Sequence, residues 1–314
     1  MPGELIIDMY AHVLRTDDIR AQAEPMAKVA RPLQWEGTVD ELRAIMRETG
    51  TWRTVVTPMP RTYTMREKAL AQLSPDLSRE ARDKAVAEIR KHLLQHMDRN
   101  NLWSCEVGRT HPEFLPFINV DPILMDAVTI RQKMREAVAR GARGVVLLPG
   151  LHGFYGNDRR AWPIYEMAQS FRLPILAQTG DAGQIPPGGR GHWGRPRYFG
   201  DVAVAFPRLQ LILGHLGKGY ESEIAVLTRR YRNVYSETST RLSGLDEGGK
   251  WTPAEAVTWF RLIGIDRILL GTEWPLFDPR QVIDTIRKLP LTPEEKRKVL
   301  GENAKRVLEL LDTR

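Results

Sequence analysis

Short apolar runs rich in β-branched residues alternate with longer amphipathic stretches along most of the chain. The short runs have the length and composition of buried strands, and the longer ones repeat their apolar residues at helical spacing. Eight segments are predicted strands: Glu4–Asp8, Trp52–Pro58, Phe114–Val120, Arg143–Leu148, Leu173–Thr179, Leu209–His215, Val234–Glu237 and Arg267–Gly271. Their order predicts a β-strand followed by a helix, repeated eight times.

The predicted helices separate these strands and close the chain. They are Val39–Glu48, Ser78–Arg99, Asp126–Arg140, Ala161–Phe171, Tyr198–Phe206, Lys218–Arg230, Pro253–Leu262, Pro279–Lys288 and Pro293–Leu311. Near-continuously apolar strands in β-then-α order indicate a parallel sheet covered on both faces, and eight such units close into a barrel. A doubly wound open sheet is the alternative, but no Gly-x-Gly-x-x-Gly follows the first strand. We therefore expect one α/β domain over residues 1–314, a (β/α)₈ TIM barrel.

Two predicted connections are longer than usual for this kind of fold. Val13–Thr38 follows the first strand and Thr179–Arg197 follows the fifth. Both leave the carboxyl end of a strand, where the active sites of these barrels lie. We therefore expect elaborated loops on the catalytic face.

The composition of the 314 residues, 42% hydrophobic and 27% charged, is that of a globular protein. The single cysteine, Cys105, excludes an internal disulfide and a zinc ribbon. No apolar run reaches the roughly 18 residues of a membrane span, and the first residues do not resemble a signal peptide. These features predict a cytoplasmic protein without a membrane partner.

The net charge of +7 raises the question of a nucleic-acid partner. The basic residues are interleaved with acidic ones, as in Arg79–Arg90, and the eight Trp residues form no stacking series. We therefore expect no nucleic-acid binding. The excess of positive charge is compatible with an electropositive entrance for an anionic small-molecule substrate.

Polar and titratable residues recur where the predicted strands end. Tyr10 and His12 follow the first strand, Gln178 lies in the fifth, His215 ends the sixth and Glu273 follows the eighth. Because the carboxyl ends of parallel barrel strands share one rim, these five side chains are expected to converge. They are the predicted catalytic residues.

Five segments carry a resemblance to a known family: Gly141–Pro149, Phe206–Gly217, Asn233–Ser239, Arg267–Pro275 and the closing Asn303-Ala304. In this order and spacing the chain resembles the amidohydrolase-related TIM barrels of the amidohydrolase superfamily. That group contains hydrolases of C–N and lactone bonds, together with nonoxidative aromatic-acid decarboxylases and hydratases. The resemblance covers nearly the whole chain and implies an enzyme.

The resemblance also implies a divalent metal, and here the chain departs from the family pattern. The usual Asp-x-His-x-His begins as Asp8-Met-Tyr10-Ala-His12, the usual strand-five histidine is Gln178, and the strand-eight aspartate is Glu273. His12, His215 and Glu273 could still form a two-histidine, one-carboxylate set for zinc or manganese. In related decarboxylases, however, the strand-six histidine is an acid or base rather than a ligand. Gln is a poor ligand, and a phenol binds well only after losing a proton of pKa about 10. We therefore expect a weak or absent metal and assign no metal ligand.

The Thr179–Gly200 segment contains seven Gly and three Pro and carries Arg190, His192 and Arg195. A mobile surface loop is one interpretation. We favour a lid whose arginines bind a carboxylate, because the segment leaves the strand that carries Gln178.

A second loop, Pro149–Asp158, follows the fourth strand and could place His152 or Tyr155 over the site. Arg61 and Arg241 follow the second and seventh strands and are further anion-binding candidates, although solvated arginines are the simpler interpretation of both.

The leading functional hypothesis is hydrolysis of a lactone, amide or related acyl bond in a small, carboxylate-bearing substrate, with or without a tightly bound metal. His215 and Glu273 would move protons and activate water, while Tyr10, His12 and Gln178 would orient the substrate. One alternative is nonoxidative decarboxylation of an aromatic acid. Another is a non-catalytic barrel that serves as a ligand sensor or as a subunit. A homo-oligomer is compatible with all three.

Overall fold

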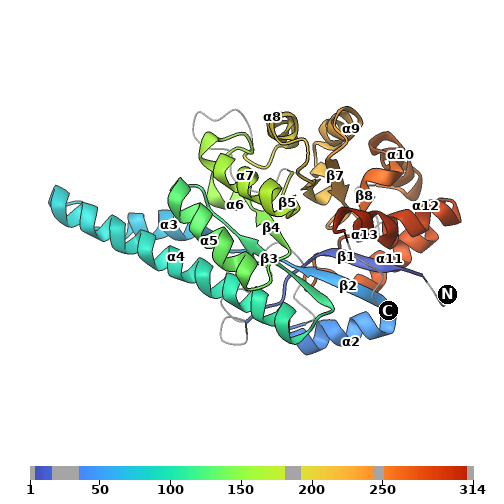
Figure 1. Ribbon diagram of the computed structural model, residues 1–314, viewed down its shortest axis with the longest axis horizontal. Helices are drawn as coiled ribbons and strands as arrows, with labels where there is room; N and C mark the ends of the chain where they lie inside the picture. Colours follow the sequence, from blue (N-terminus) through green and yellow to red (C-terminus); the bar gives the residue numbers. More distant parts are fainter. Residues whose placement is uncertain (1–3, 16–34, 181–191, 243–250, 310–314) are drawn as a thin grey trace.

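The structure is a computed structural model that describes residues 4–15, 35–180, 192–242 and 251–309. Eight strands form one sheet in the order β1 to β8, and each pairs in parallel with the next (Figure 1). They are β1 (Ile6–Ala11), β2 (Thr51–Val56), β3 (Phe114–Asn119), β4 (Gly144–Leu147), β5 (Ile175–Ala177), β6 (Leu211–Leu213), β7 (Val234–Glu237) and β8 (Ile268–Leu269). The predicted barrel of eight parallel strands is confirmed.

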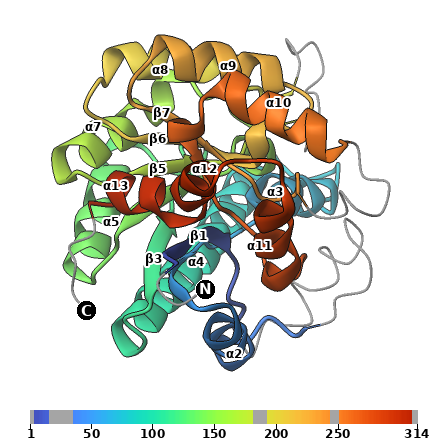
Figure 2. The same cartoon turned by 90° about the vertical axis from the view of Figure 1, so that its right-hand side faces the viewer.

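Helices surround this sheet, as Figure 2 shows. They are α2 (Val39–Thr49), α3 (Thr62–Ala71), α4 (Arg79–Thr110), α5 (Ala127–Ala139), α6 (Pro149–His152), α7 (Trp162–Phe171), α8 (Gly200–Ala205), α9 (Glu221–Arg230), α10 (Pro253–Ile263), α11 (Pro279–Lys288), α12 (Pro293–Arg297) and α13 (Asn303–Val307). Shorter 3₁₀ segments are η1 (Arg159–Ala161), η2 (Pro196–Phe199), η3 (Gly214–Gly217) and η5 (Ile265–Arg267), and η6 (Lys298–Glu302) is π-helical.

The core has two layers because successive strand residues point to opposite faces of the sheet. In β6, Ile212 points into the barrel interior together with Leu176 of β5, and both are fully buried. Their neighbours Leu211 and Leu213 belong to the outer layer under the helices. Both faces of most strands are therefore packed, β2 being only partly buried over its first three residues, which explains the near-continuous apolar runs and makes the barrel a rigid support for its rim.

The barrel closes between β1 and the segment after β8 through a few backbone hydrogen bonds rather than a regular ladder. The Met9 N–H donates to the Leu270 carbonyl at 2.8 Å, and the Glu273 N–H donates to the Tyr10 carbonyl at 2.6 Å. We call this junction the seam. It brings the two ends of the barrel together at the rim.

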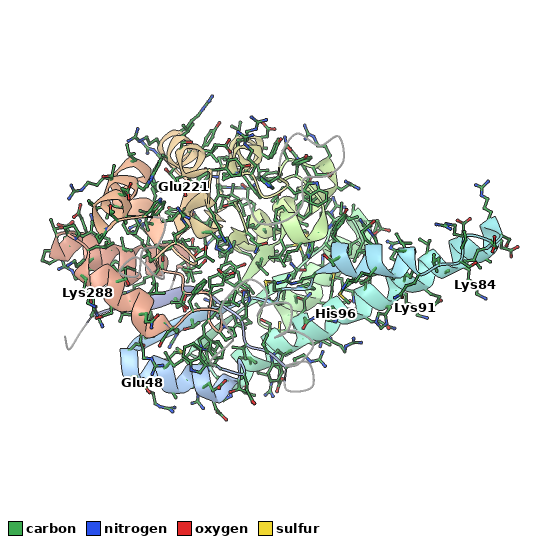
Figure 3. All side chains as sticks on the ribbon, turned by 180° about the vertical axis from the view of Figure 1, so that it is seen from behind. Glu48, Lys84, Lys91, His96, Glu221 and Lys288 are labelled. Atoms are coloured by element: carbon green, nitrogen blue, oxygen red, sulfur yellow. The ribbon has the colours of Figure 1, made fainter. Side chains whose placement is uncertain are left out.

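Helix α4, which leads into β3, extends further than predicted. We expected Ser78–Arg99, ending before Asn100 and Asn101, which are poor helix formers, whereas α4 runs to Thr110. Asn101 is accommodated because its amide bonds the backbone N–H and carbonyl of Asn119 in β3, both at 2.8 Å. The first part of α4 extends beyond the barrel, where Lys84 and Lys91 lie among other charged side chains (Figures 1 and 3).

Two further boundaries differ from the prediction. Helix α3 was not predicted, because its sequence TYTMREKALA lacks a continuous apolar stripe. The predicted helix Pro293–Leu311 is divided into α12, the π-helical turn η6 and α13, and its last two residues lie outside the described part. At Gly301 in η6 a Cβ atom would lie 2.3 Å from the Leu5 carbonyl oxygen, so this close approach requires glycine.

The two long loops fall partly outside the described residues. Residues 16–34 of Val13–Thr38 and residues 181–191 of Thr179–Gly200, including Arg190, are among those not described. The described ends of the second loop meet, since the Gly180 N–H donates to the Gly194 carbonyl at 2.9 Å. Within the described ranges, no helix is both long and apolar enough to cross a membrane.

Candidate active site

Hydrogen bonds to Asp8 connect the two segments of the seam. One of its carboxylate oxygens accepts the Tyr10 and Thr272 N–H groups, each at 3.0 Å, and the other accepts the Thr272 hydroxyl at 2.5 Å. Asp8 is only 2% exposed, and this burial raises the pKa of its carboxyl to about 7 despite the three hydrogen bonds. Because Tyr10 lies two residues after Asp8 and Glu273 directly follows Thr272, this contact sets the positions of both candidate residues.

Glu273 and His215 both occupy left-handed backbone conformations, with φ of 60° at each. Such values are uncommon outside glycine and persist where surrounding contacts determine them. Here the Glu273 N–H donates to the Tyr10 carbonyl, and the His215 N–H donates to the Glu237 carboxylate at 2.7 Å. At both positions this backbone conformation directs the side chain, of Glu273 or of His215, into the site.

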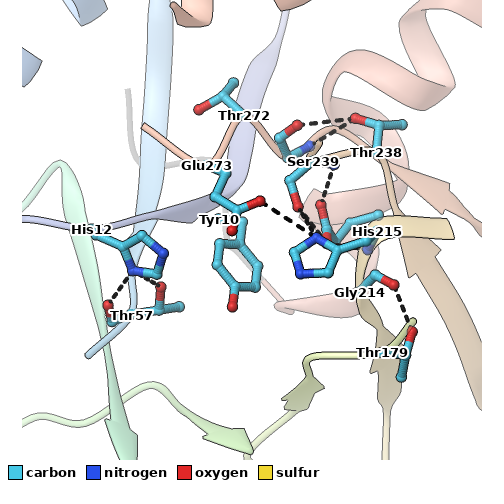
Figure 4. Close-up of polar contacts among 12 residues, drawn as sticks. Tyr10, His12, Thr57, Thr179, Gly214, His215, Thr238, Ser239, Thr272 and Glu273 are labelled. Carbon is cyan, nitrogen blue, oxygen red and sulfur yellow. Dashed lines mark hydrogen bonds and ion pairs between the residues drawn. The ribbon is translucent and has the colours of Figure 1, made fainter. Parts of the chain in front are cut away.

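Tyr10 lies between the two histidines of the site (Figure 4). Its ring centroid is 5.2 Å from that of His12 and 5.3 Å from that of His215. Glu273 also contacts His215, with Glu273 Oε2 3.5 Å from His215 Nδ1. The structure thus brings together four of the five predicted catalytic residues, and we refer to Tyr10, His12, His215 and Glu273 as the seam cluster.

Gln178, the fifth, lies just beyond β5. Its backbone N–H donates to the Leu147 carbonyl at 2.8 Å, and it is 9% exposed. A Cβ atom built on Gly214, the residue before His215, would lie 3.5 Å from the Gln178 Cα. Gln178 is therefore beside the strand end that carries His215.

His12 is held by the neighbouring strand end. Its Nδ1 lies 2.8 Å from the Thr57 carbonyl oxygen and 3.0 Å from the Thr57 hydroxyl. Because a carbonyl only accepts, Nδ1 carries the proton and Nε2 is left with its lone pair. The ring is therefore fixed with an acceptor nitrogen available.

Three polar atoms of the seam cluster have no hydrogen-bond partner in the structure as described. They are Tyr10 Oη, His12 Nε2 and Glu273 Oε2, and all three are buried. A buried polar atom left unpaired costs about 1–3 kcal/mol. Such atoms are rare in native proteins and need an explanation, and a bound ligand that pairs with them is one.

His215 is connected to a second buried carboxylate through a serine. Its Nδ1 is 2.7 Å from Ser239 Oγ, which lies 2.8 Å from Glu237 Oε1. Glu237 Oε2 accepts the Ser239 N–H at 2.6 Å. Glu237 and Ser239 are fully buried at the end of β7. Both belong to a segment that carried the family resemblance, but neither was predicted as functional. The sequence feature that could have indicated them is an acidic residue within a predicted buried strand.

The electrostatics of the site favour uncharged side chains. Burial and, next, the charge of Glu237 raise the pKa of Glu273 to about 8. Burial lowers the pKa of His12 to about 4 and that of His215 to about 3, with Lys218 contributing to the second shift. Burial also raises the pKa of Tyr10 well above its usual value. At neutral pH the seam cluster therefore contains a mostly protonated carboxylic acid, two neutral imidazoles and a neutral phenol.

Cations flank this uncharged cluster. Arg61 and Lys218 both act on Glu273, lowering its pKa against the effect of burial. Arg241 adds to the lowering of the His215 pKa; it is itself paired with Glu221 at 2.6 Å and lies over the Trp251 ring. Lys218 was not among the predicted residues. The local field around the seam cluster therefore favours an anionic ligand.

The predicted substrate-binding residues on the second loop lie in other contacts. His152 is completely buried, with Nε2 3.2 Å from the Pro60 carbonyl oxygen and Nδ1 3.9 Å from Asp121. The Tyr155 ring packs against Tyr198 with centroids 4.6 Å apart. Neither has a described contact with the seam cluster, and their role in substrate binding remains a prediction.

The described basic residues of the Thr179–Gly200 loop face α9. His192 Nδ1 is 2.7 Å from the Tyr220 hydroxyl, and Arg195 pairs with Glu223 at 2.6 Å. We call these four residues the α9 rim. Arg195 would have to exchange its Glu223 partner to bind a substrate carboxylate, so its predicted role, like that of His192, is not tested by this arrangement.

The residues of the seam cluster do not fit the divalent metal that the family pattern implies. In the described ranges no three His, Cys, Asp or Glu side chains are grouped so that they could hold a metal. The neutral Tyr10 ring separates His12 from His215, and Gln178 replaces a further nitrogen ligand. Low metal content remains a prediction about the purified protein.

Solved structures with the same fold include decarboxylases of aromatic acids. An uncharacterised TIM-barrel protein from Bordetella bronchiseptica is 19% identical, with a TM-score of 0.71 and coverage of 97% of this chain and 98% of the other. The 5-carboxyvanillate decarboxylase of Sphingomonas paucimobilis is 13% identical, with a TM-score of 0.66 and coverage of 98% and 100%. A dihydroxybenzoic acid decarboxylase of Polaromonas, solved with manganese and the inhibitor 2-nitroresorcinol, is 16% identical, with a TM-score of 0.67 and coverage of 98% and 97%.

At these identities the similarity establishes a shared fold and nothing finer. A search of curated protein sequences found no match. The sequence itself matches the family model described as amidohydrolase over residues 7–310, nearly its full length. Together with the eight-stranded barrel, this match places the chain in the amidohydrolase family of TIM-barrel proteins.

Proposed function

We propose that this protein is a nonoxidative decarboxylase of a hydroxy-substituted aromatic acid. The observation that carries the proposal is an uncharged acid, Glu273, whose Oε2 is buried and unpaired beside the neutral His215. Decarboxylation requires a proton donor for the carbon that loses CO2, and a carboxylic acid held protonated at neutral pH supplies one.

The proposed reaction balances with this chain's own groups. The Glu273 acid transfers its proton to the ring carbon that bears the carboxylate, while His215 Nε2 takes the proton of an ortho or para hydroxyl. The bond from that carbon to the carboxylate then breaks, its electron pair returns to the ring and CO2 leaves. His215 returns its proton to the ring oxygen, and Glu273 regains one from water. One proton is consumed for each CO2 released.

The surroundings of the seam cluster suit such a substrate. Arg61 and Lys218 provide positive charge for a carboxylate, and the three unpaired atoms of the cluster offer partners for polar groups on a ring. Structures of the same fold include 2,6-dihydroxybenzoate decarboxylase bound to 2,6-dihydroxybenzoate. That substrate class agrees with the proposal, although the resemblance of fold does not identify it.

Hydrolysis of an acyl bond is the second candidate, since His215 Nε2 could activate water as a base. The two candidates differ in the form of Glu273 that they need. A decarboxylase uses the protonated acid, so its activity falls as pH rises through about 8. A hydrolase that uses the Glu273 carboxylate as a base gains activity over the same interval.

The test is a substrate panel assayed by CO2 release and by product analysis. It contains 2,6-dihydroxybenzoate, 5-carboxyvanillate, 4-hydroxybenzoate and a matched set of lactones and amides. We expect CO2 from at least one hydroxybenzoate and, in D2O, one deuterium at the vacated ring carbon. Turnover of lactones or amides without CO2 would show a hydrolase instead, and tight binding of acids without any turnover would show a non-catalytic ligand-binding protein.

A further inference from the structure

Ser239 connects the imidazole of His215 to the carboxylate of Glu237 in a buried chain of hydrogen bonds. His215 Nδ1 is 2.7 Å from Ser239 Oγ, and Ser239 Oγ is 2.8 Å from Glu237 Oε1. Figure 4 shows the contact between Ser239 and the His215 ring. The direct distance from His215 Nδ1 to Glu237 Oε1 is 3.5 Å, which is too long for a normal hydrogen bond.

The direction of this chain follows from the number of protons available. Burial raises the pKa of Glu237 to about 7, so above that pH it is a carboxylate, and its oxygens accept two backbone N–H groups, from His215 on Oε1 and from Ser239 on Oε2. The Ser239 hydroxyl has one proton, which it therefore donates to Glu237. Its oxygen can then only accept from His215, and this requires the proton of the imidazole to be on Nδ1.

We infer that Ser239 and Glu237 are positioning residues that hold His215 in its Nδ1–H tautomer and leave Nε2 unprotonated toward the substrate. The burial of His215, together with Lys218 nearby, disfavours a second proton on the ring. Nδ1, which faces Ser239, therefore carries the proton. In histidine the hydrogen bond made by one ring nitrogen generally decides which nitrogen is protonated.

The carboxylate of Glu237 is built into the barrel. A Cβ atom on Gly271 would lie 1.9 Å from Glu237 Oε2, and one on Gly214 would lie 3.1 Å from Oε1. Glycine on both adjoining strand ends therefore leaves the space that the carboxylate fills. When Glu237 is ionised, each of its oxygens is hydrogen-bonded within this enclosed space, and the tautomer of His215 follows from that arrangement.

The consequence for substrate choice rests on the proposed function. An unprotonated Nε2 accepts a hydrogen bond and cannot donate one, so the substrate group that faces it has to be a donor. This favours a ring acid with a free hydroxyl over its methyl ether. Discrimination against an analogue that leaves a buried partner unpaired is large in general, and we expect at least a tenfold lower kcat/KM for the ether.

The tautomer can be measured without any substrate by ¹⁵N NMR of histidine-labelled protein. The chain has seven histidines, and the His215 signals are assigned by their loss in His215→Asn. Above pH 7, where Glu237 is mostly ionised, we expect a protonated Nδ1 and an unprotonated Nε2 in the wild type, mixed tautomers in Ser239→Ala, and the wild-type pattern in Ser239→Thr, which keeps a hydroxyl. Ser236→Ala is the matched control, because Ser236 is a buried serine of β7, three residues before Ser239, and donates to the Leu213 carbonyl instead.

A protonated Nε2 in the wild type would overturn the inference, and so would His215 signals in Ser239→Ala identical to those of the wild type. With any substrate that turns over, Ser239→Ala should lower kcat at least about tenfold, a part of the usual general acid–base contribution, while Ser239→Thr and Ser236→Ala stay near wild type. Failure of the proposed decarboxylation would leave the NMR result intact, so the two outcomes are distinguishable.

Discussion

The seam cluster and the α9 rim both present polar side chains at the mouth of one barrel, but they differ in whether those side chains are paired. On the α9 rim, Arg195 bonds Glu223 and His192 bonds Tyr220, and both members of the ion pair retain contact with water. In the seam cluster the side chains are almost completely buried, and Tyr10, His12 and Glu273 each have an unpaired atom.

This difference separates residues that stabilise the fold from residues available for chemistry. Exposed ion pairs contribute little and can form wherever opposite charges meet. Buried unpaired atoms lower stability, and proteins retain such costs mainly at functional sites. Basic residues in a Gly-rich loop were the more conspicuous pattern in the sequence, whereas the unpaired groups of the seam mark the better candidate for catalysis.

The largest expected effect comes from removing the proposed proton-transfer groups of the seam cluster. Glu273→Gln and His215→Asn should each lower kcat by at least about a hundredfold, the scale of general acid–base catalysis. Thermal unfolding should change little, because both residues lie at the rim rather than in a packed barrel layer. Steady-state kinetics with a melting curve tests both statements, and near-wild-type kcat in either variant would remove that residue from the mechanism.

The pH dependence of activity should show the raised pKa of Glu273. For a decarboxylase, kcat should fall about tenfold per pH unit above pH 8, because only the protonated acid donates. Stopped assays of CO2 release from pH 6 to 10 measure this. An increase in kcat over the same interval would favour the hydrolytic candidate.

The two regions should differ in their effect on binding of an anion. Arg61→Ala should weaken the binding of an unreactive aromatic carboxylate such as benzoate about tenfold or more, the scale of a charge-assisted contact. Arg195→Ala should have a smaller effect, because Arg195 must first give up Glu223. Calorimetric titration with benzoate and with methyl benzoate as the uncharged control measures both. A larger effect at Arg195 would restore the loop as the main anion-binding element.

Stability should fall as pH rises from neutral, in part because of the seam cluster. The pKa of Glu273 is raised from 4.5 in the unfolded chain to about 8, so its favourable contribution is complete below pH 4.5 and is lost as pH rises through 8. Between pH 6.5 and 8.5 the free energy of unfolding of the wild type should fall about 2 kcal/mol more than that of Glu273→Gln. Denaturant titrations at both pH values would show equal changes if Glu273 ionised normally.

The smallest expected effect is that of a chelator. Tyr10 and Gln178 weaken the donor set, so the purified protein should contain much less than one equivalent of zinc or manganese, and EDTA should change activity less than about twofold. Elemental analysis together with assays before and after chelation decides this. One equivalent of metal, with activity lost on its removal, would make His12 and Glu273 the first residues to test as ligands.

The barrel could be predicted from the sequence because most of its strands are buried on both faces and therefore consist of nearly continuous apolar residues. The rim residues Tyr10, His12, His215 and Glu273 could be predicted because parallel strands end at one side of the sheet. Glu237 and Ser239 could not, because their importance depends on hydrogen bonds to His215 that only the folded strand β7 creates. The Asn101 contact that extends α4 across β3 was hidden for the same reason.

The seam has a consequence for how active protein is made. Asp8 and Thr272 are separated by 264 positions in the chain, yet their contact fixes the backbone on both sides of the candidate active site. A nascent or truncated chain can form seven strands and still lack the alignment of Tyr10 with Glu273, because the last strand has to close on the first. Enzymatic activity should therefore report complete folding rather than partial folding, and fragments that end before β8 should be inactive even where they are compact.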